Sequence, residues 1–279
     1  MEVILGTAQL ASRYGVMATQ RASEPRAVAI LDAARRLGVR TVDTAPGYGG
    51  AEAAIGTAGA GLAVHTKLPS GQEPAAALGA SLERLRRDQV EVLHLHDPDV
   101  VLDAEDPQLA AAAALVGAGA EAIGASIYTR EQFLAGVADP RIAVIQAPLN
   151  VLDRRILDED LRLAARSGTR VIARSALLQG LLGDPAQAMG RVPLLDDGLA
   201  AFLAACRQVG RAPVDLAIGW VRARPGVVGV VLGAETPEQI EDLARAFYAP
   251  ALQDDEVRLL ASLSPPPEGA ADPRTWSRT

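Results

Sequence analysis

The sequence predicts an α/β protein that forms a single (β/α)8 TIM barrel, in which a closed parallel sheet is surrounded by helices. Eight short segments rich in Val, Ile and Leu recur along the chain, segments with helical spacing separate them, and 279 residues suit one barrel. The runner-up is an open, doubly wound sheet. It is less favoured because no Gly-x-Gly-x-x-Gly motif follows the first strand, where a dinucleotide-binding sheet usually carries one.

The predicted strands are continuous apolar runs, which is typical of strands buried on both faces. In chain order they are VILGT (3–7), VRTVDTA (39–45), GLAVHTK (61–67), VEVLHLH (90–96), EAIGASI (121–127), AVIQAPL (143–149), RVIARSAL (170–177) and VVGVVLG (227–233). The segments between them have the period of a helix, as Leu78, Leu82 and Leu85 illustrate. Alternation of strand and helix through the whole chain favours closure of the sheet.

We expect residues 1–264 to form the barrel. The tail, residues 265–279, is too rich in proline for another helix, and we expect it to lie as a loop over one barrel mouth. The longest connection, residues 178–213, contains its own predicted helix around GLAAFLAACRQVG. No segment has the composition of a linker between domains.

Composition excludes several classes of protein. With 49% hydrophobic and 22% charged residues, the chain buries a large core and is neither disordered nor a coiled coil. A net charge of -7 without a long basic run argues against nucleic acid as a partner. The single cysteine, Cys206, excludes an internal disulfide and a multi-thiolate metal site. The chain start lacks the features of a signal peptide and no apolar run reaches membrane length, so we expect a cytoplasmic protein that does not span a membrane.

Polar side chains stand where predicted strands end, which is where a barrel of this kind carries its reactive groups. They are Asp43, Lys67 and His96 at three strand ends and Tyr48 in the loop DTAPGYGG. The chain holds 26 arginines and one lysine, and that lysine is Lys67. A lysine ammonium is compact and can shift its pKa, unlike the guanidinium used everywhere else in this chain.

The same residues leave two other chemistries open. His94 and His96 form an HxH pair that could bind zinc, although no further histidine follows and a metal site would depend on carboxylates. Lys67 could form a Schiff base in a lyase, which would leave Asp43 and Tyr48 without a distinctive role. His65 and His94 share the strand faces of Lys67 and His96, and we expect them one layer deeper in the barrel.

Seven segments resemble, in order and spacing, the sequence blocks of the aldo-keto reductase superfamily. They are TVDTAPGYGGAEAAIG, HTKLP, LHLHDP, IGASIY, IQAPLN, IARSALLQGLL and LGAETPEQIEDL, and the opening GTAQLASRYGV is similar to the first strand and loop of bacterial members. The resemblance spans nearly the whole chain. It implies a (β/α)8 barrel that transfers a hydride between a nicotinamide cofactor and a carbonyl group.

The resemblance implies a catalytic tetrad of Asp43, Tyr48, Lys67 and His96. A tyrosine with its usual pKa of about 10 is a poor acid near neutral pH, and a neighbouring ammonium favours the phenolate. Lys67 would supply that charge, Asp43 would hold Lys67, and His96 would donate a hydrogen bond to the carbonyl oxygen. Tyr48 would then deliver the proton.

The resemblance also implies which residues contact the cofactor. These are Gly6 and Thr7 in the first loop, Ser126 and Gln146 at the nicotinamide amide, Arg174, Ser175 and Leu177 beneath the ring and pyrophosphate, and Gly233, Glu235 and Gln239 for the adenosine half. A capped helix start after the eighth strand is in addition a ready site for an anion.

Four positions depart from the family pattern. Ile127 replaces an asparagine that contacts nicotinamide, and Arg174 replaces an aromatic that stacks on the ring. At the position of Glu235 the family commonly has a neutral or basic residue, and at the position of Leu243 it commonly has asparagine. An acid near the adenine ribose would accept hydrogen bonds from a 2'-hydroxyl and repel a 2'-phosphate. The resemblance to the family favours NADPH as the cofactor, with NADH as the alternative.

The substrate is expected to be a small carbonyl compound. Only nine residues are aromatic, which argues against an aromatic box for steroids or large apolar aldehydes. The candidates for the pocket wall are Tyr14, Tyr128 and Trp276, and Arg274 and Arg278 flank the last of these. We therefore expect a polar or anionic compound, such as a sugar derivative, under a closed tail. The competing functions are a cofactor-binding sensor or auxiliary barrel without catalysis and, less favoured, a metal-dependent hydrolase.

Overall fold

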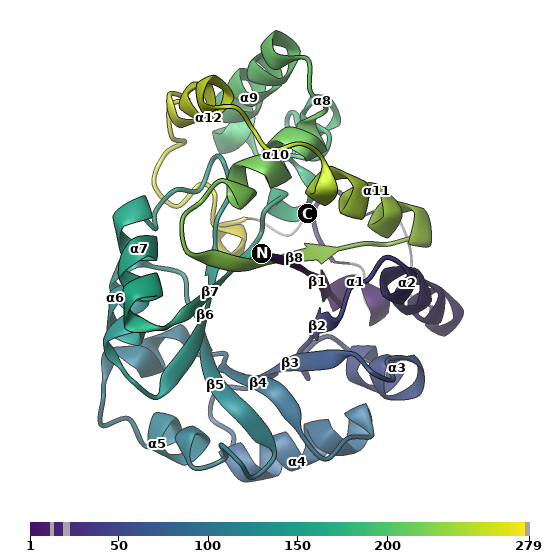
Figure 1. Cartoon of the computed structure of the whole chain (residues 1–279), viewed down its shortest axis with the longest axis vertical. Helices are drawn as coiled ribbons and strands as arrows, with labels where there is room; N and C mark the ends of the chain where they lie inside the picture. Colours follow the sequence, from purple (N-terminus) through teal and green to yellow (C-terminus); the bar gives the residue numbers. More distant parts are fainter. Residues whose placement is uncertain (12–13, 19–22, 277–279) are drawn as a thin grey trace.

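Eight parallel strands close into a barrel in the computed structural model, which describes residues 1–11, 14–18 and 23–276 (Figure 1). The strands are β1 (Glu2–Gly6), β2 (Thr41–Asp43), β3 (Ala63–Leu68), β4 (Val90–Leu95), β5 (Ala120–Ser126), β6 (Ile142–Pro148), β7 (Arg170–Arg174) and β8 (Val227–Gly233). Each strand pairs with the next in the chain, and β8 pairs with β1. The predicted (β/α)8 barrel is confirmed, and the open sheet was the wrong alternative.

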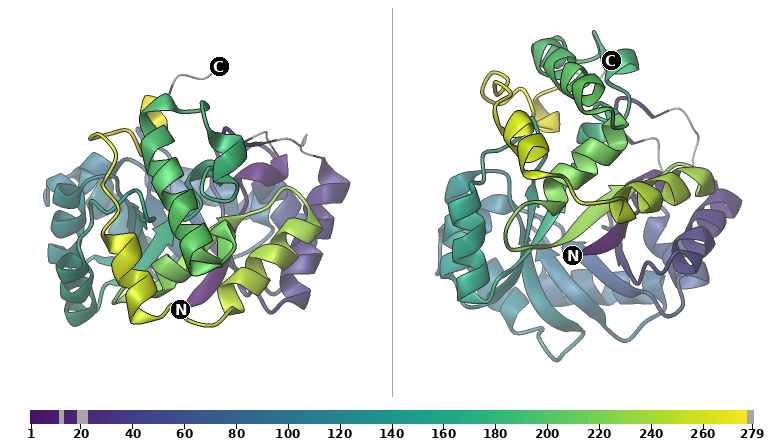
Figure 2. Two further views of the ribbon diagram at one scale, coloured as in Figure 1. Left: turned by 90° about the horizontal axis from the view of Figure 1, so that it is seen from above. Right: turned by 45° about the horizontal axis from the view of Figure 1, so that its top comes forward.

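Helices surround the sheet on its outer side (Figures 1 and 2). They are α1 (Ala8–Ala11), α2 (Glu24–Arg36), α3 (Ala51–Ala58), α4 (Pro74–Leu85), α5 (Pro107–Ala113), α6 (Arg130–Ala138), α7 (Asp158–Ser167), α8 (Pro185–Ala188), α9 (Asp196–Val209), α10 (Pro213–Arg222), α11 (Pro237–Tyr248) and α12 (Asp254–Ala261), with short 3-10 turns at Pro98–Leu102, Leu178–Gly180, Pro193–Leu195 and Pro273–Thr275. Proline stands in the first turn of many of these helices, where its missing N–H costs no helical hydrogen bond.

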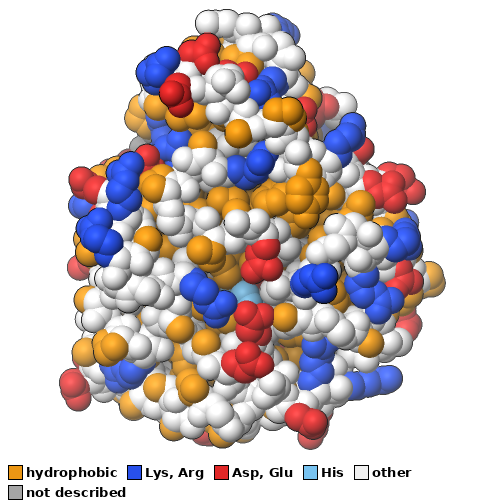
Figure 3. All heavy atoms as spheres, viewed as in Figure 1, with side chains coloured by type: hydrophobic (Ala, Val, Ile, Leu, Met, Phe, Trp, Pro, Cys, Tyr) orange, Lys and Arg blue, Asp and Glu red, His pale blue; other side chains and the backbone are white. Residues whose placement is uncertain are grey.

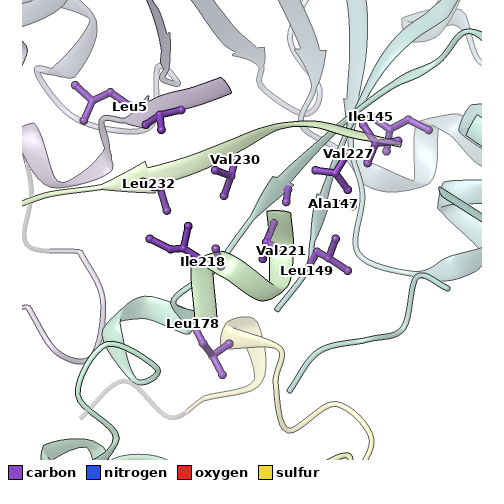
Figure 4. Close-up of a cluster of buried hydrophobic side chains, with 14 of the residues drawn as sticks. Leu5, Ile145, Ala147, Leu149, Leu178, Ile218, Val221, Val227, Val230 and Leu232 are labelled. Carbon is purple, nitrogen blue, oxygen red and sulfur yellow. The ribbon is translucent and has the colours of Figure 1, made fainter. Parts of the chain in front are cut away.

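The main apolar core fills the space between the strands and the helices. Figure 4 shows Ile218 and Val221 of α10 close to Val230 and Leu232 of β8, and all four side chains are completely or almost completely buried. Burying a side chain of this size contributes about 1.5–3 kcal/mol each. Cys206 of α9 is also buried, which raises the pKa of its thiol to about 11, so the thiol is protonated near neutral pH.

A second, smaller group of apolar side chains lies inside the barrel. It consists of Ile4, Val92, Val144 and Ile172, which come from β1, β4, β6 and β7. Side chains alternate between the two faces of a strand, so the residues two positions further along these strands also point inward. Three of these positions are polar, namely His94, Gln146 and Arg174, and the fourth is Gly6.

Some predicted boundaries differ from the observed ones. Segment 39–45 was predicted as a strand, but β2 extends only from Thr41 to Asp43. Segment 170–177 was also predicted, but β7 ends at Arg174 because Ser175 has a φ of 58°, which turns the chain out of the sheet. The connection 178–213 contains not only the predicted helix, α9, but also α8 and two 3-10 turns.

The tail after residue 264 lies beside the barrel toward the ends of the strands (Figure 2). Its described part, residues 265–276, contains one 3-10 turn, and the indole N–H of Trp276 donates a hydrogen bond of 2.8 Å to the carbonyl of Ala270. Arg278 lies outside the described residues. In the part of the chain that the structure describes, no helix has both the length and the apolar character needed to span a membrane.

Candidate active site

The ammonium group of Lys67 lies at the centre of the candidate site, buried at the end of β3. It donates hydrogen bonds of 2.7 and 2.8 Å to the two carboxylate oxygens of Asp43 and one of 2.9 Å to the carbonyl of Thr44. Lys67 is 2% exposed and Asp43 3%, so this ion pair is removed from water. The neighbouring strands β2 and β3 thus hold a buried cation in a fixed place, as a catalytic lysine requires.

Burial and charge act in opposite directions on Lys67. Desolvation lowers the pKa of the ammonium, but the charge of Asp43, the charge of Tyr48 and the hydrogen bonds with Asp43 outweigh it and raise the pKa above its usual value. Lys67 therefore remains an ammonium at neutral pH. A neutral amine that could attack a carbonyl carbon is disfavoured, and so the geometry argues against the Schiff-base alternative.

Tyr48 and His96 complete the group of four residues predicted from the strand ends. The Nζ atom of Lys67 lies 5.2 Å from the centre of the Tyr48 ring, which places the phenol and the solitary lysine side by side. His96 directly follows β4 and opens onto the mouth. Burial by the surrounding walls and the charge of Lys67 lower the pKa of His96, so its imidazole is neutral at pH 7 and can donate a hydrogen bond.

A pair of buried histidines lies deeper in the barrel than the tetrad. The rings of His65 and His94 are 5.6 Å apart between centroids, and both side chains are almost completely buried, in agreement with the predicted deeper layer. Gly124 makes room for His94, because a Cβ at this glycine would lie 2.4 Å from Nδ1 of His94. At the end where the strands begin, His65 Nε2 is 3.7 Å from a carboxylate oxygen of Glu91, which is paired with Arg170. Figure 3 shows a histidine at the centre of this face among acidic and basic side chains.

The buried imidazole of His94 predicts a loss of stability in mild acid. Burial, followed by the charges of His65 and Lys67, lowers the pKa of His94 well below its usual value. Below about pH 6.5 the unfolded chain binds a proton at this residue that the folded chain does not, so each further pH unit costs about 1.4 kcal/mol of unfolding free energy until the folded pKa is reached. Urea unfolding between about pH 7.5 and 5.5 measures this slope.

The variant His94→Asn has no titrating group at position 94. Its unfolding free energy is therefore expected to depend less steeply on pH, by the equivalent of about one bound proton. It also lowers stability at the upper pH, because asparagine leaves space inside the barrel. His96→Asn is the matched control and is expected to flatten the slope less, since His96 is open to the mouth. An identical slope in the wild type and His94→Asn would contradict the prediction.

Residues predicted to bind the nicotinamide lie at the ends of β1, β5 and β6. Gln146 donates a hydrogen bond of 2.7 Å from its amide nitrogen to Asp43, across the barrel from β6 to β2, and it lines the cavity. Ser126 is its register partner on β5, and Thr7 donates its hydroxyl hydrogen to the carbonyl of Asp43. A Cβ at Gly6 would lie 2.9 Å from the side chain of Val231, so a residue with a side chain would crowd this wall of the cavity.

The loop after β7 has an unusual backbone. Ser175, Leu178 and Gln179 all have positive φ angles, between 48° and 58°, a conformation that costs free energy for side chains other than glycine. The side-chain amide of Asn150 donates to the carbonyl of Ser175, and the side chain of Gln179 accepts a hydrogen bond from the backbone of Val16. These contacts hold the loop at the rim of the cavity. No sequence pattern pointed to Gln179, because a positive φ at a residue other than glycine leaves no mark in composition.

The start of α11 forms the other end of the site. The hydroxyl of Thr236 accepts a hydrogen bond from the backbone of Gln239, and the side chain of Gln239 accepts one from the backbone of Glu235. Gln239 therefore acts at the helix start and also faces the cavity. A Cβ at Gly233 would lie 2.4 Å from the end of the Gln9 side chain, so a larger residue at the end of β8 would require Gln9 to move.

The three residues predicted as substrate walls lie in different places. Tyr14 and Tyr128 line the cavity, and burial together with the charge of Tyr48 raises the pKa of Tyr14. Trp276 is not among the described lining residues; it packs on the main core. The tail reaches the site through Arg274 instead, whose guanidinium carbon lies 3.4 Å from the centre of the Tyr128 ring.

One cavity of about 420 Å³ joins these parts, within the range of small-molecule sites. All four tetrad residues line it, as do all the residues predicted to bind a cofactor. The described lining also includes residues that the sequence did not single out, namely Ala8, Gln9, Met17, Ala18, Leu178, Gln179, Gly180, Gly183, Asp184, Val214, Val231, Leu232 and Asp242. They come from strands, helices and loops far apart in the chain, so no local pattern could identify them.

The shape and donor set of the cavity fit a nicotinamide dinucleotide. One end holds Gln146 and Ser126, which suit a carboxamide, and the other end is a capped helix start, which suits phosphate. Within the described residues, no three His, Cys, Asp or Glu side chains are grouped to hold a metal ion. His94 points into the barrel and His96 opens onto the mouth, so the HxH pair does not converge on one point.

Comparisons with known proteins identify relatives of this chain. The model described as "Aldo/keto reductase family" matches residues 2–265. The chain is 27% identical to L-galactose dehydrogenase of Arabidopsis thaliana over 266 residues, which cover 85% of this chain and 81% of that protein. It is 26% identical to the uncharacterized oxidoreductase YrpG of Bacillus subtilis (strain 168) over 208 residues, which cover 69% of this chain but only 64% of that protein.

Solved structures show the same fold. The aldo-keto reductase AKR11C1 from Bacillus halodurans, in its holo form, has a TM-score of 0.78 and 24% identity over 94% of this chain and 92% of that one. The glycerol dehydrogenase AKR11B4 from Gluconobacter oxydans has a TM-score of 0.71 and 23% identity over 94% of this chain and 90% of that one. Since the family model covers nearly the whole sequence, this chain belongs to the aldo/keto reductase family.

Proposed function

We propose that this protein is an NAD(P)H-dependent reductase that converts an aldehyde or ketone to an alcohol, with Tyr48 as the proton donor. Family membership and oxidoreductase relatives support carbonyl reduction in general. The observation that carries the finer proposal is the buried ammonium of Lys67, held by Asp43 and 5.2 Å from the Tyr48 ring at the floor of the cavity. A buried positive charge beside a phenol stabilises the phenolate that remains after proton transfer.

Each residue of the tetrad has a separate task in this proposal. His96, neutral at pH 7, donates a hydrogen bond to the substrate oxygen and orients the carbonyl. Tyr48 gives its proton to the same oxygen, and Lys67 stabilises the phenolate that remains. Asp43 keeps the ammonium charged and in place, and Gln146 holds Asp43 from the opposite wall. A bound nicotinamide would supply the hydride.

The cofactor preference that we propose is NADH rather than the NADPH that the resemblance implied. Glu235 and Asp242 line the cavity at the start of α11, and Asp242 is paired with Arg245 at the surface. Among the described lining residues, the only lysine and arginine are Lys67 and Arg174, which belong to the ends of β3 and β7. A 2'-phosphate at the helix start would therefore meet carboxylates, whereas a ribose 2'-hydroxyl could donate hydrogen bonds to them.

Titration of the purified protein with NADH and NADPH, followed by cofactor fluorescence, tests this preference. We expect NADH to bind about tenfold more tightly or better, which corresponds to about 1.4 kcal/mol. Glu235→Gln is expected to narrow the difference between the affinities for NADH and NADPH. Glu238→Gln, which removes the same charge three residues later at a position outside the described lining, is the matched control and leaves it unchanged. Equal affinities for the two cofactors would contradict the preference.

Turnover of a panel of aldehydes and ketones with the preferred cofactor tests the reaction itself. Cofactor binding together with turnover is the expected result. Cofactor binding without turnover of any carbonyl compound would overturn the enzymatic proposal in favour of a sensor or auxiliary barrel.

A further inference from the structure

We propose that Arg174 forms an anion subsite beside the tetrad, and that the substrate is a carbonyl compound carrying a carboxylate or a phosphate. The inference rests on the proposed function and names the substrate class of the same site. It departs from the expectation that Arg174 lies beneath the nicotinamide ring. Its basis is the fixed position, the direction and the lack of an ion pair of this one guanidinium group among the described residues.

Arg174 is held rigidly at the wall of the cavity. It ends β7 and is half-buried, and its guanidinium carbon lies 4.2 Å from the centre of the Tyr128 ring. One terminal nitrogen donates a hydrogen bond of 3.0 Å to the carbonyl of Ile127. A guanidinium that is stacked and hydrogen-bonded in this way loses little further entropy when it binds an anion.

The tail contributes to this rigidity through the same ring. The guanidinium carbon of Arg274 is 3.4 Å from the Tyr128 centroid, so the ring packs against both guanidinium groups. Arg174 faces the cavity and Arg274 does not line it, so the tail supports the wall from outside.

Arg174 forms no ion pair at contact distance with any described residue, unlike its neighbours, although the charge of Asp153 lies within electrostatic range of it. Arg274 is paired with Asp272 at 2.6 Å, Arg155 with Asp153 at 2.7 Å, and Lys67 with Asp43 at 2.7 Å. The two hydrogen bonds of Arg174, to Ile127 and a long one of 3.5 Å to the Ser175 hydroxyl, leave most of its five N–H donors unused. A half-buried guanidinium with free donors on a cavity wall is suited to a carboxylate or phosphate group.

The direction of the side chain favours the substrate over the cofactor as the source of the anion. Arg174 reaches from β7 past β6 to the loop after β5, where it contacts Ile127 and Tyr128. The capped helix start that suits the cofactor phosphates follows β8, on the other side of β7. The positive charge of Arg174 is also among the causes that lower the pKa of His96, so the two groups act on the same part of the mouth.

Paired substrates with and without the charge test the subsite. Succinic semialdehyde is compared with butanal, and glyceraldehyde 3-phosphate with glyceraldehyde, each with saturating NADH. We expect kcat/KM of the wild type to favour the charged member of at least one pair by about tenfold or more. Preference within the first pair assigns a carboxylate to the subsite, and preference within the second assigns a phosphate.

Arg174→Gln is expected to lose about tenfold to a hundredfold in kcat/KM on the charged member, mainly through KM, and less than about threefold on the neutral one. Its affinity for NADH stays within about twofold of the wild type. Arg274→Gln removes the guanidinium that is paired with Asp272, contacts Tyr128 and lies outside the described lining of the cavity, and it is the matched control; it keeps most of the preference for the charged substrate. Equal losses on both members, or a weakened NADH affinity with an unchanged preference, would overturn the subsite.

Calorimetric titration of the protein with succinate and with inorganic phosphate separates this inference from the proposed function. Binding of either anion by the wild type that is lost in Arg174→Gln supports the subsite even without any turnover. Turnover of neutral carbonyl compounds alone, together with no anion binding, would leave the proposed function intact and refute the subsite.

Discussion

Replacing Tyr48 by phenylalanine is expected to lower kcat for carbonyl reduction by about a hundredfold to ten-thousandfold. The phenol is the only group of the tetrad that can donate a proton to the substrate oxygen while the ammonium of Lys67 stabilises the anion left behind. The ammonium itself donates its three hydrogen bonds to Asp43 and Thr44. Phenylalanine keeps the ring 5.2 Å from the ammonium and removes only the hydroxyl.

The readout that isolates the chemical step is the contrast between kcat and cofactor affinity. Tyr48→Phe is expected to bind NADH within about twofold of the wild type and to unfold at nearly the same urea concentration. Tyr248→Phe, on the exposed outer side of α11, removes the same hydroxyl far from the cavity and keeps full activity. Turnover by Tyr48→Phe equal to that of the wild type would remove Tyr48 as the proton donor.

Replacing Lys67 by methionine is expected to abolish turnover and to destabilise the protein by about 3–5 kcal/mol at neutral pH. The change leaves the carboxylate of Asp43, which is 3% exposed, without its cation. Since the folded pKa of Lys67 is raised, the stabilisation from this pair is complete below the unfolded pKa of about 10.4 and is lost only as pH rises through the folded pKa. Urea unfolding at neutral pH therefore measures the full loss.

The double variant Asp43→Asn, Lys67→Met shows whether the cost comes from the unpaired charge. It is expected to be more stable than Lys67→Met by at least about 1 kcal/mol, because no charge remains buried, and to stay inactive. Arg40→Met, at an exposed position, is the control and changes stability by less than about 0.5 kcal/mol. A single variant as stable as the wild type, or a double variant no more stable than the single one, would refute this account.

The strand ends show how far sequence reasoning reached into the site. Asp43, Lys67 and His96 were singled out because polar residues closed apolar runs, and the closed barrel brings these three strand ends together at one mouth. The parity of His65 and His94 correctly placed both deeper in the barrel. Hydrophobic periodicity and the alternation of side chains along a strand are local properties, so both can be determined without knowledge of the tertiary structure.

The site residues that depend on long-range contacts were misplaced or missed. Trp276 was expected at the substrate wall, but the tail folds so that its indole bonds to Ala270, and Arg274 meets Tyr128 instead. Gln146 was expected near the nicotinamide amide, and its hydrogen bond to Asp43 across the barrel, 103 positions away in the chain, was not foreseen. No spacing rule connects such partners, because the distance between them is set by closure of the sheet.

The sequence by itself determined the (β/α)8 topology and the strand ends that carry polar groups, since hydrophobic period and helix capping act over a few residues. Only the tertiary structure decided which charges form ion pairs. Lys67 pairs with a carboxylate from the adjacent strand, whereas Arg174 forms no ion pair with any described residue and is fixed by stacking on Tyr128. Ion pairing depends on distances of a few ångströms between groups far apart in the chain, and these distances exist only once the barrel has closed.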